Sequence, residues 1–160
     1  MVQSSISINT QTSTVSFSVK KFVFLTVKGQ FSNLTGSVQF QEDDLANSTF
    51  DVQISSATVN TENEKRDEHL RNEDFFFVKQ YPTISFKSTT ITQAAVGYEV
   101  EGQLTMLDKS VHVRIPFQFD GASFKGDLTI QRSAFGLGKK FPGFFVGNDI
   151  SVSINAQLKK

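Results

Sequence analysis

The sequence predicts an all-β fold, an antiparallel β-barrel of about eight strands with a short capping helix. Three observations support this prediction: apolar residues recur at every second position of Ser/Thr-rich runs, Phe accounts for 17 of 160 residues, and one segment alone has a helical signature. Successive side chains of a strand point to opposite faces, so the alternation gives each strand one apolar and one wet face. Eight or more strands closed on themselves leave no sheet edge.

The alternating runs should pair as the strands of one antiparallel meander. The predicted strands are 2–8, 13–20, 27–31, 34–42, 48–57, 82–91, 97–106, 109–119, 122–132 and 148–158. Gly36, Gly102 and Gly126 fall inside these runs, where glycine permits the sharp coiling that a closed barrel needs. Pro116 has no N–H to donate to a ladder, so a bulge or a break in pairing is expected there.

A single short helix is predicted between the fifth and sixth strands. Thr61, followed three positions later by Glu64, matches a capping box, and the helix should run to Leu70 or Arg71. Because this segment is short and polar, it should cover one mouth of the barrel rather than form a packing layer of its own.

Composition excludes several classes of protein. The length and the lack of any linker predict a single domain over residues 1–160, and no run approaches the ~20 apolar residues of a membrane-spanning helix. Sixteen basic and sixteen acidic residues cancel, which argues against a nucleic-acid partner. The absence of Cys excludes disulfides and thiolate metal sites. The first fifteen residues do not resemble a secretory signal, so we expect a cytoplasmic chain as it stands, or a periplasmic one if a leader has been removed.

Two segments break the alternation with dense aromatic residues, 75–77 and 135–145, and the second contains Lys139 and Lys140. Large apolar side chains in loops need either a core to enter or an apolar ligand to contact. Two interpretations remain open: a hydrophobic plug that seals the barrel end, or a portal through which an apolar molecule enters. In the portal interpretation the adjacent lysines suit a membrane interface or an anionic head group.

The barrel interior can be filled by side chains or can hold one small ligand. A Phe-rich wall with few inward polar groups favours a long apolar tail. The wall candidates are Phe17, Val19, Phe40, Ile54, Phe86, Leu104, Ile115, Phe117 and Phe135. The mouth candidates are Phe76, Phe141, Phe144 and Phe145, and the candidates for hydrogen bonds to a head group are Arg66, Asp67 and Arg132.

We find no convincing catalytic or metal-binding constellation in the sequence. His69 and His112 lack a partner at metal-ligand spacing, and there is no Cys nucleophile. We therefore expect no catalytic residues, no metal ligands and no cofactor other than a bound lipid with an unbranched or isoprenoid tail.

A series of motifs resembles the YceI-like, polyisoprenoid-binding family, with order and spacing kept across almost the whole chain. The motifs are Val59-Asn60-Thr61, Arg66-Asp67, His69-Leu70-Arg71, Asp74-Phe75-Phe76, Tyr81-Pro82-Thr83-Ile84-Ser85-Phe86, Gly102-Gln103-Leu104-Thr105 and Arg132-Ser133-Ala134-Phe135-Gly136-Leu137. The resemblance implies a lipocalin-like eight-stranded barrel, capped by a helix, whose tubular cavity holds a long prenyl or fatty chain such as that of an isoprenoid quinone. It implies binding rather than catalysis, and family members are commonly exported to the bacterial periplasm. The chain departs from the family pattern at Asn60, Thr12, Lys21 and Asp108, which leaves the head group open.

Three functions are weighed against one another. The first is carriage or sequestration of a long-chain apolar lipid, with the membrane surface as a transient partner. The second is a structural or interaction barrel with a filled core, whose aromatic loops pack inward or against a partner subunit, as in a homodimer. The third and least favoured is an enzyme acting on such a lipid, which would need His69, Arg66 and Asp67 turned together toward the cavity.

Overall fold

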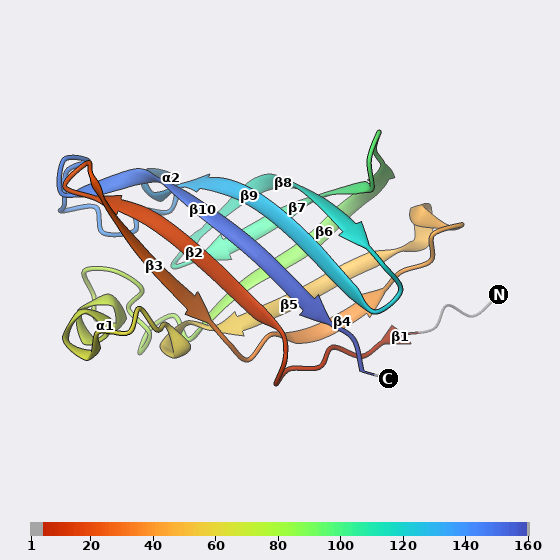
Figure 1. Cartoon of the computed structure of the whole chain (residues 1–160), viewed down its shortest axis with the longest axis horizontal. Coiled ribbons are helices and arrows are strands. Elements are labelled where there is room, and N and C mark those ends of the chain that lie inside the picture. Colours follow the sequence, from red (N-terminus) through yellow and green to blue (C-terminus); the bar gives the residue numbers. More distant parts are fainter. Residues whose placement is uncertain (1–4, 160) are drawn as a thin grey trace.

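The computed structural model describes residues 5–159, which form one strongly curled antiparallel sheet with short helices at one end (Figure 1). The strands are β1 Ser5–Ile6, β2 Thr14–Lys21, β3 Leu25–Phe31, β4 Thr35–Gln39, β5 Thr49–Ser55, β6 Thr83–Gln93, β7 Tyr98–Met106, β8 Lys109–Phe119, β9 Ser123–Gln131 and β10 Val146–Gln157. The helices are α1 Glu64–Arg71 and α2 Arg132–Phe135, with 3-10 turns at Leu45–Asn47 and Ser56–Thr58. Residues 2–4 of the first predicted strand lie outside the described part of the chain.

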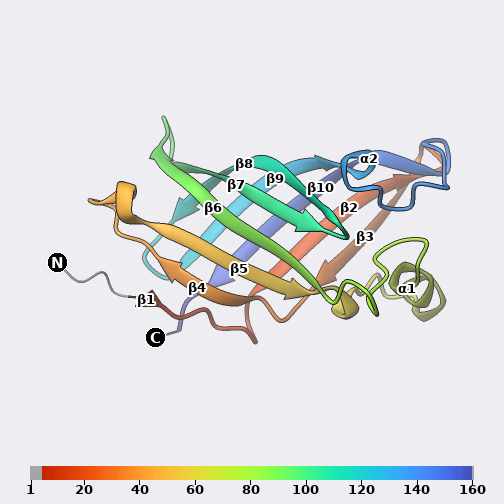
Figure 2. The same cartoon turned by 180° about the vertical axis from the view of Figure 1, so that it is seen from behind.

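The strand order is β1-β4-β5-β6-β7-β8-β9-β10-β2-β3, so the expected meander runs from β4 to β10 and the β2–β3 hairpin pairs with β10. The predicted all-β, lipocalin-like antiparallel architecture is confirmed, with ten strands in residues 5–159 rather than about eight. Seen from behind, β5 to β8 form one wall, and α1 and α2 lie at the same end (Figure 2).

Closure of the barrel differs from the prediction, because β1 and β3 are edges of the hydrogen-bonded sheet. Single antiparallel bridges, Ile8 to Leu158 and Gln30 to Asn60, span the seam instead of a continuous ladder. The chain leaves β3 through Asn33, at φ 61°, and β4 continues onward from the end of β3 rather than back beside it (Figure 1), so β3 and β4 do not form a hairpin that would close the sheet.

The predicted break at Pro116 is found on one side of β8. Pairing with β7 continues through Glu99 and Pro116, whereas pairing with β9 covers only residues 117–119 opposite 124–126. A proline lacks the N–H that a second ladder would require. The rest of β8 therefore separates from β9, and α2 contacts β8, β9 and β10 in that region.

Tight coiling of the sheet is visible where β6 meets β7. The register shifts between Ser88 and Thr90, and Gly102 lies opposite the shift. A Cβ at Gly102 would lie 2.3 Å from the carbonyl oxygen of Lys87. This confirms that glycine inside the strand allows a close backbone approach.

The capping helix α1 ends at the predicted residue, but the predicted capping box is wrong. Asn63 is the N-cap, and its side chain accepts a hydrogen bond from the backbone N–H of Arg66. Glu62, at φ 61°, turns the chain between Thr61 and the helix, so Thr61 does not occupy the N-cap position. Thr61 instead bonds to Asp67 within the helix.

The end of the barrel opposite α1 and α2 is filled by aromatic side chains. Their ring centroids lie 4.6–6.0 Å apart, mostly in tilted or edge-to-face arrangements. Such pairs stabilise beyond the area they bury. The cluster, here called the aromatic plug, comprises Phe40, Phe50, Tyr98, Phe117, Phe119 and Phe124.

Candidate functional site

An apolar cavity of about 180 Å³ lies inside the barrel on the side of α1 and α2. Eight strands contribute to its wall, together with residues of α1, of α2 and of the segments that follow them. The lining is apolar except for Gln53, Ser85 and Arg132. An interior of this kind suits a hydrocarbon and gives a polar metabolite few partners.

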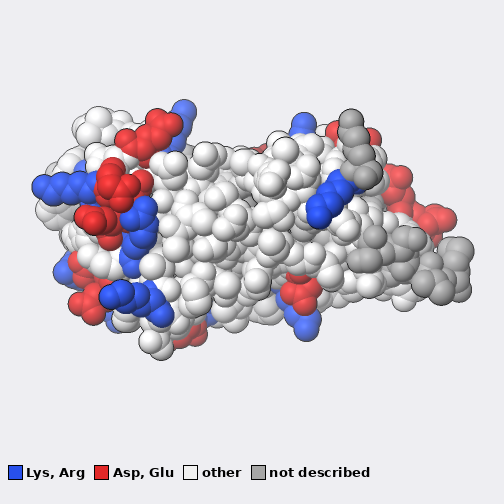
Figure 3. Space-filling model, turned by 90° about the horizontal axis from the view of Figure 1, so that it is seen from below, with Lys and Arg blue, Asp and Glu red and all other residues white. Residues whose placement is uncertain are grey.

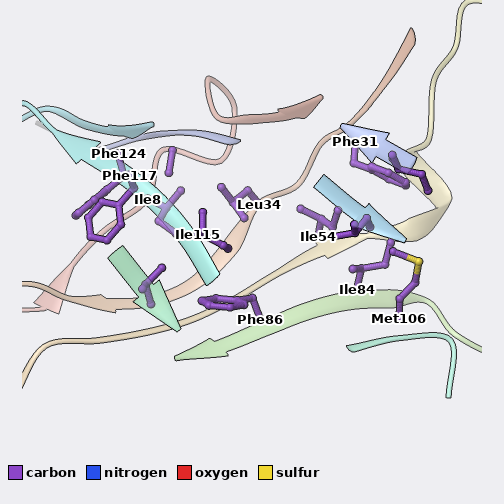
Figure 4. Packing of buried hydrophobic residues seen from close by; sticks show 14 of the residues in the cluster. Ile8, Phe31, Leu34, Ile54, Ile84, Phe86, Met106, Ile115, Phe117 and Phe124 are labelled. Atoms are coloured by element: carbon purple, nitrogen blue, oxygen red, sulfur yellow. The ribbon is translucent and has the colours of Figure 1, made fainter. Parts of the chain in front are cut away.

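A second apolar cavity of about 80 Å³ lies closer to the aromatic plug. Five side chains border both cavities and thus form the partition between them: Leu34, Val52, Phe86, Ile115 and Ile154. In Figure 4, Leu34, Phe86 and Ile115 lie between one group with Phe31, Ile54, Ile84 and Met106 and another with Ile8, Phe117 and Phe124. The interior is therefore hollow along part of the barrel axis and interrupted by side chains.

The structure brings about half of the predicted site residues together at these cavities. The larger cavity is lined by Phe17, Val19, Ile54, Phe76, Phe86, Leu104, Ile115 and Arg132, and the smaller by Phe86, Ile115 and Phe117. Phe40 belongs to the aromatic plug, beyond the end of β4. Phe135 is fully buried but borders neither cavity, and it lies in the short helix α2 rather than on a strand as predicted.

Arg132 is almost completely buried, with 7% of its surface exposed, and it organises the segment between α2 and β10. Its five N–H groups donate to five backbone carbonyls at 2.6–3.2 Å, those of Leu137, Gly138, Phe141, Val146 and Gly147. A guanidinium carries five N–H donors, so none remains for a head group in this structure. Burial lowers the pKa of Arg132 below its ordinary value. Arg132 thus shapes the cavity wall by holding backbone.

Arg66 and Asp67 border neither cavity, and their polar atoms are engaged by Thr61. The buried Asp67 carboxylate accepts from the backbone N–H of Thr61 at 2.9 Å and from its hydroxyl. Arg66 donates from Nε to the Thr61 hydroxyl and from its terminal nitrogen to the Thr61 carbonyl, both at 2.8 Å. These contacts fix the segment that enters α1.

A polar contact joins α1 to the segment after α2. Asp74 lies 2.9 Å from His69 Nε2 through one oxygen and 2.9 Å from Lys140 Nζ through the other. The hydrogen bonds from Lys140 and then His69 hold the pKa of Asp74 below its ordinary value. Next to this group, here called the Asp74 latch, the Phe141 ring stacks on Phe75 with centroids 5.2 Å apart. Phe75 lines the cavity, so Phe141 packs against a residue of the cavity wall next to the latch.

The remaining mouth candidates point outward. Phe144 and Phe145 are exposed and border neither cavity. They lie in the segment just before Val146, which does line the larger cavity. The exposed position of Phe144 and Phe145 fits the portal interpretation of the aromatic loops. Phe75 and Phe76 are buried, which fits the interpretation that these loops seal the barrel end near α1, opposite the aromatic plug.

Sequence reasoning did not name many of the lining residues. Several lie two positions from a named wall residue on the same strand face, and the alternation could have found them: Val15, Val52, Ile84 and Met106. Ile150, Val152 and Ile154 alternate along β10, a strand on which no wall residue was named. Phe31, Leu34, Leu70 and Leu137 lie at the ends of elements or between them. The alternation of a strand does not predict which way the side chains of such residues point.

In residues 5–159, no three His, Cys, Asp or Glu side chains are placed so that they could hold a metal ion. None of the helices described is both long and apolar enough to cross a bilayer. His69 is engaged with Asp74 and Asp67 with Thr61, so the groups considered for an enzyme do not converge on the cavity.

A family model described as the YceI-like domain matches residues 7–158. The chain belongs to the YceI-like domain family. Among relatives of this YceI-like chain, a UPF0312 protein of Yersinia enterocolitica is 34% identical over 92 residues, which are 58% of this chain and 48% of that protein. The match thus spans about half of the Yersinia protein. A UPF0312 protein of Pseudomonas aeruginosa is 28% identical over 133 residues, covering 77% of this chain and 70% of its own.

Solved structures share the fold of this YceI-like chain. BcnA of Burkholderia cenocepacia superposes with a TM-score of 0.87 at 25% identity, over 96% of this chain and 99% of BcnA. A YceI protein of Campylobacter jejuni gives 0.75 at 27% identity, over 84% and 85% of the two chains. A polyisoprenoid binding domain from Saccharophagus degradans, implicated in plant cell wall breakdown, gives 0.70 at 14% identity over 99% of both chains, a similarity of fold alone.

Proposed function

We propose that this YceI-like chain binds a long-chain apolar lipid, of polyisoprenoid or isoprenoid-quinone type, and carries or sequesters it. The observation that carries the proposal is the cavity, whose wall is apolar except at three residues. The same fold occurs in a domain described as polyisoprenoid-binding, which makes a prenyl chain the first candidate.

The size of the cavity defines how a long chain would fit. An engineered apolar cavity of about 150 Å³ holds one benzene molecule, so 180 Å³ admits the leading part of a prenyl chain. Rotation of Leu34 and Phe86, which border both cavities, would join the smaller space to the larger. The chain would then extend along the axis toward the aromatic plug.

Affinity in this arrangement comes from the tail. Each enclosed CH₂ contributes about 0.8 kcal/mol, so ten enclosed carbons would contribute roughly 8 kcal/mol before the cost of association. The N–H groups of Arg132 are occupied by backbone carbonyls. A head group would therefore remain at the mouth near α1 and α2, and its contacts would set selectivity more than affinity.

Binding without catalysis is part of the proposal, because among the described residues the cavity lining offers the Ser85 hydroxyl no His, Asp, Glu or Lys base and contains no metal-ligand set. The interaction barrel with a filled core is the alternative, and the aromatic plug is the observation that favours it. It predicts that no lipid can be extracted or loaded.

The test is organic extraction of the purified protein followed by mass spectrometry, and loading with an isoprenoid quinone. Leu128→Trp fills the cavity from β9, and Thr129→Trp is the matched control because Thr129 is the exposed neighbour on the opposite face. We expect the wild type and Thr129→Trp to load and Leu128→Trp to load much less, with all three folded by circular dichroism. No extracted lipid and no loading of the wild type would refute the proposal.

A further inference from the structure

Six large apolar side chains are exposed together at the end of the barrel where α1 and α2 lie. They come from the turn between β2 and β3 and from the segment before β10, and they comprise Phe22, Val23, Phe24, Leu25, Phe144 and Phe145. Among the described residues the one other exposed large apolar side chain is Val96, between β6 and β7 at the far end. Scattered apolar residues are normal on a surface, whereas a contiguous group marks an interaction site. This group is here called the apolar tip.

The two segments of the apolar tip are held to each other. The backbone N–H of Phe22 donates to the carbonyl of Phe145 at 3.2 Å, and the two rings lie 5.7 Å apart between centroids. Phe144 lies 5.6 Å from Phe145 and 6.5 Å from Phe22 by the same measure. Phe24 is 89% exposed. The tip is a built surface that projects apolar rings into solvent.

The residues of the turn are unfavourable for its backbone conformation, which indicates that they serve a purpose other than stability. Residues 22–24 form the loop, because Lys21 pairs with Leu25. Phe22 and Val23 have φ values of 52° and 69°, the left-handed region that Gly and Asn adopt most easily. A β-branched residue such as Val23 is strained there. An aromatic and a branched apolar residue in a strained, exposed turn are explained by something that they contact.

Lysines precede both segments of the apolar tip in the chain: Lys20 and Lys21 come directly before Phe22, and Lys139 and Lys140 come before Phe144. Lys21 Nζ lies 5.5 Å from the centroid of the Phe22 ring, and Lys140 is paired with Asp74. Among the described residues, no carboxylate lies within ion-pair distance of Lys20, Lys21 or Lys139. Apolar rings with lysines set back from them match the two layers of an anionic bilayer surface.

The acidic residues of α1 lie on another side of this end. Figure 3 shows both charge signs at the end that carries α1, and Figure 1 places α1 and the β2–β3 turn on opposite sides of that end. Glu64 and Glu68 belong to α1. A flat anionic surface can therefore meet the apolar tip and its lysines without facing the carboxylates of the helix.

We propose that the apolar tip docks the protein on an anionic lipid bilayer, with its Phe and Leu side chains in the interface and its lysines on the head groups. The position fits the cavity, because Val19 and Val146 line the cavity and lie close in sequence to Phe22 and Phe145. This step rests on the proposed function: the docked mouth receives the apolar lipid directly from the membrane. Docking itself does not require the cavity.

The test is co-sedimentation with phosphatidylcholine vesicles, with and without phosphatidylglycerol. The wild type should bind the anionic vesicles, less at higher salt. A Phe24→Ser/Phe144→Ser double variant should bind about tenfold more weakly or worse, because the burial of two Phe side chains is lost. Val96→Ser removes an exposed apolar residue at the far end and should bind like the wild type.

A second variant keeps the apolar residues and tests charge. Lys21→Glu/Lys139→Glu should lose the preference for phosphatidylglycerol while it remains folded by circular dichroism. Wild-type protein that ignores anionic vesicles, or variants that bind them as the wild type does, would overturn the proposal. A wild-type dimer that the double Ser variant converts to monomer, without vesicle binding, would assign the tip to a second copy and also overturn it.

Loading with farnesol in the absence of vesicles separates this proposal from the proposed function. The double Ser variant should load like the wild type, because neither Phe24 nor Phe144 borders a cavity. A wild-type protein that binds vesicles but does not load farnesol would contradict the lipid cavity and leave the docking surface standing. A wild-type protein that loads farnesol but does not bind vesicles would contradict the docking surface and leave the lipid cavity standing.

Discussion

Replacing Arg132 by Met should destabilise the fold by about 3–5 kcal/mol, because a buried guanidinium that serves five carbonyls would be lost. A net contribution of about 0.5–1.5 kcal/mol for each hydrogen bond brackets this loss, and the apolar Met side chain recovers part of it by avoiding desolvation. Urea unfolding followed by circular dichroism measures the difference. Loading of the cavity should weaken as well, since Leu137 and Val146 belong both to its wall and to the segment that Arg132 holds.

Two further substitutions show whether the planar arrangement of the five N–H donors of Arg132 matters. Arg132→Lys keeps the charge but offers three donors from one point, so it should recover less than half of the lost stability. Arg114→Met is the matched control: Arg114 is 68% exposed and its Nε lies 3.4 Å from Glu101, so the loss should not exceed about 1 kcal/mol. An Arg132→Met protein within about 1 kcal/mol of the wild type would refute the argument that these bonds hold the mouth.

Three other outcomes can be measured with the same methods. The Asp74 carboxylate has a depressed pKa in the folded protein, so its contribution to stability is present above its ordinary pKa of 3.8 and is lost as the pH falls below that value. The difference in urea midpoint between wild type and Asp74→Asn should therefore shrink below pH 3.8. A difference that stays constant with pH would contradict the latch. Phe117→Ala should cost about 3–5 kcal/mol in the aromatic plug, whereas Phe86→Ala should cost less and raise the amount of quinone that loads; equal costs with unchanged loading would contradict the partition. Val23→Gly should raise stability by up to about 1 kcal/mol by relieving a positive φ, and a loss of stability would show that the turn is not strained.

Much of the sheet could be predicted because alternation is a local signal. The strand 109–119 has the predicted bounds, and the break at Pro116 follows from one missing N–H. Closure could not be predicted in the same way. The edges left free are β1 and β3, and whether they meet depends on how far the whole sheet curls, which no local run of residues determines.

The candidate site was predicted well on strands and poorly in loops. Phe17 and Ile115 face the cavity because their strand phase decides it. Thr61 and Asn63 are both competent N-caps, and the backbone of Glu62 chooses between them. The connection between β2 and β3 was predicted, but its exposed apolar residues were not named as a site, because it contains no Gly, Asn, Asp or Pro to mark a tight turn.

The two ends of the barrel differ in what holds them. At one end the aromatic plug packs ring against ring, and such packing supplies stability without polar chemistry. At the other end the core is hollow, Val23 is strained, and the chain is held by polar contacts of Arg132 and Asp74. An empty space and a strained turn both lower stability, so they persist when the surrounding structure compensates for them. The stability that the aromatic plug supplies thus offsets the cost of the cavity and the strained turn at the other end. Mutations in the plug should reduce stability without changing which lipid the mouth accepts.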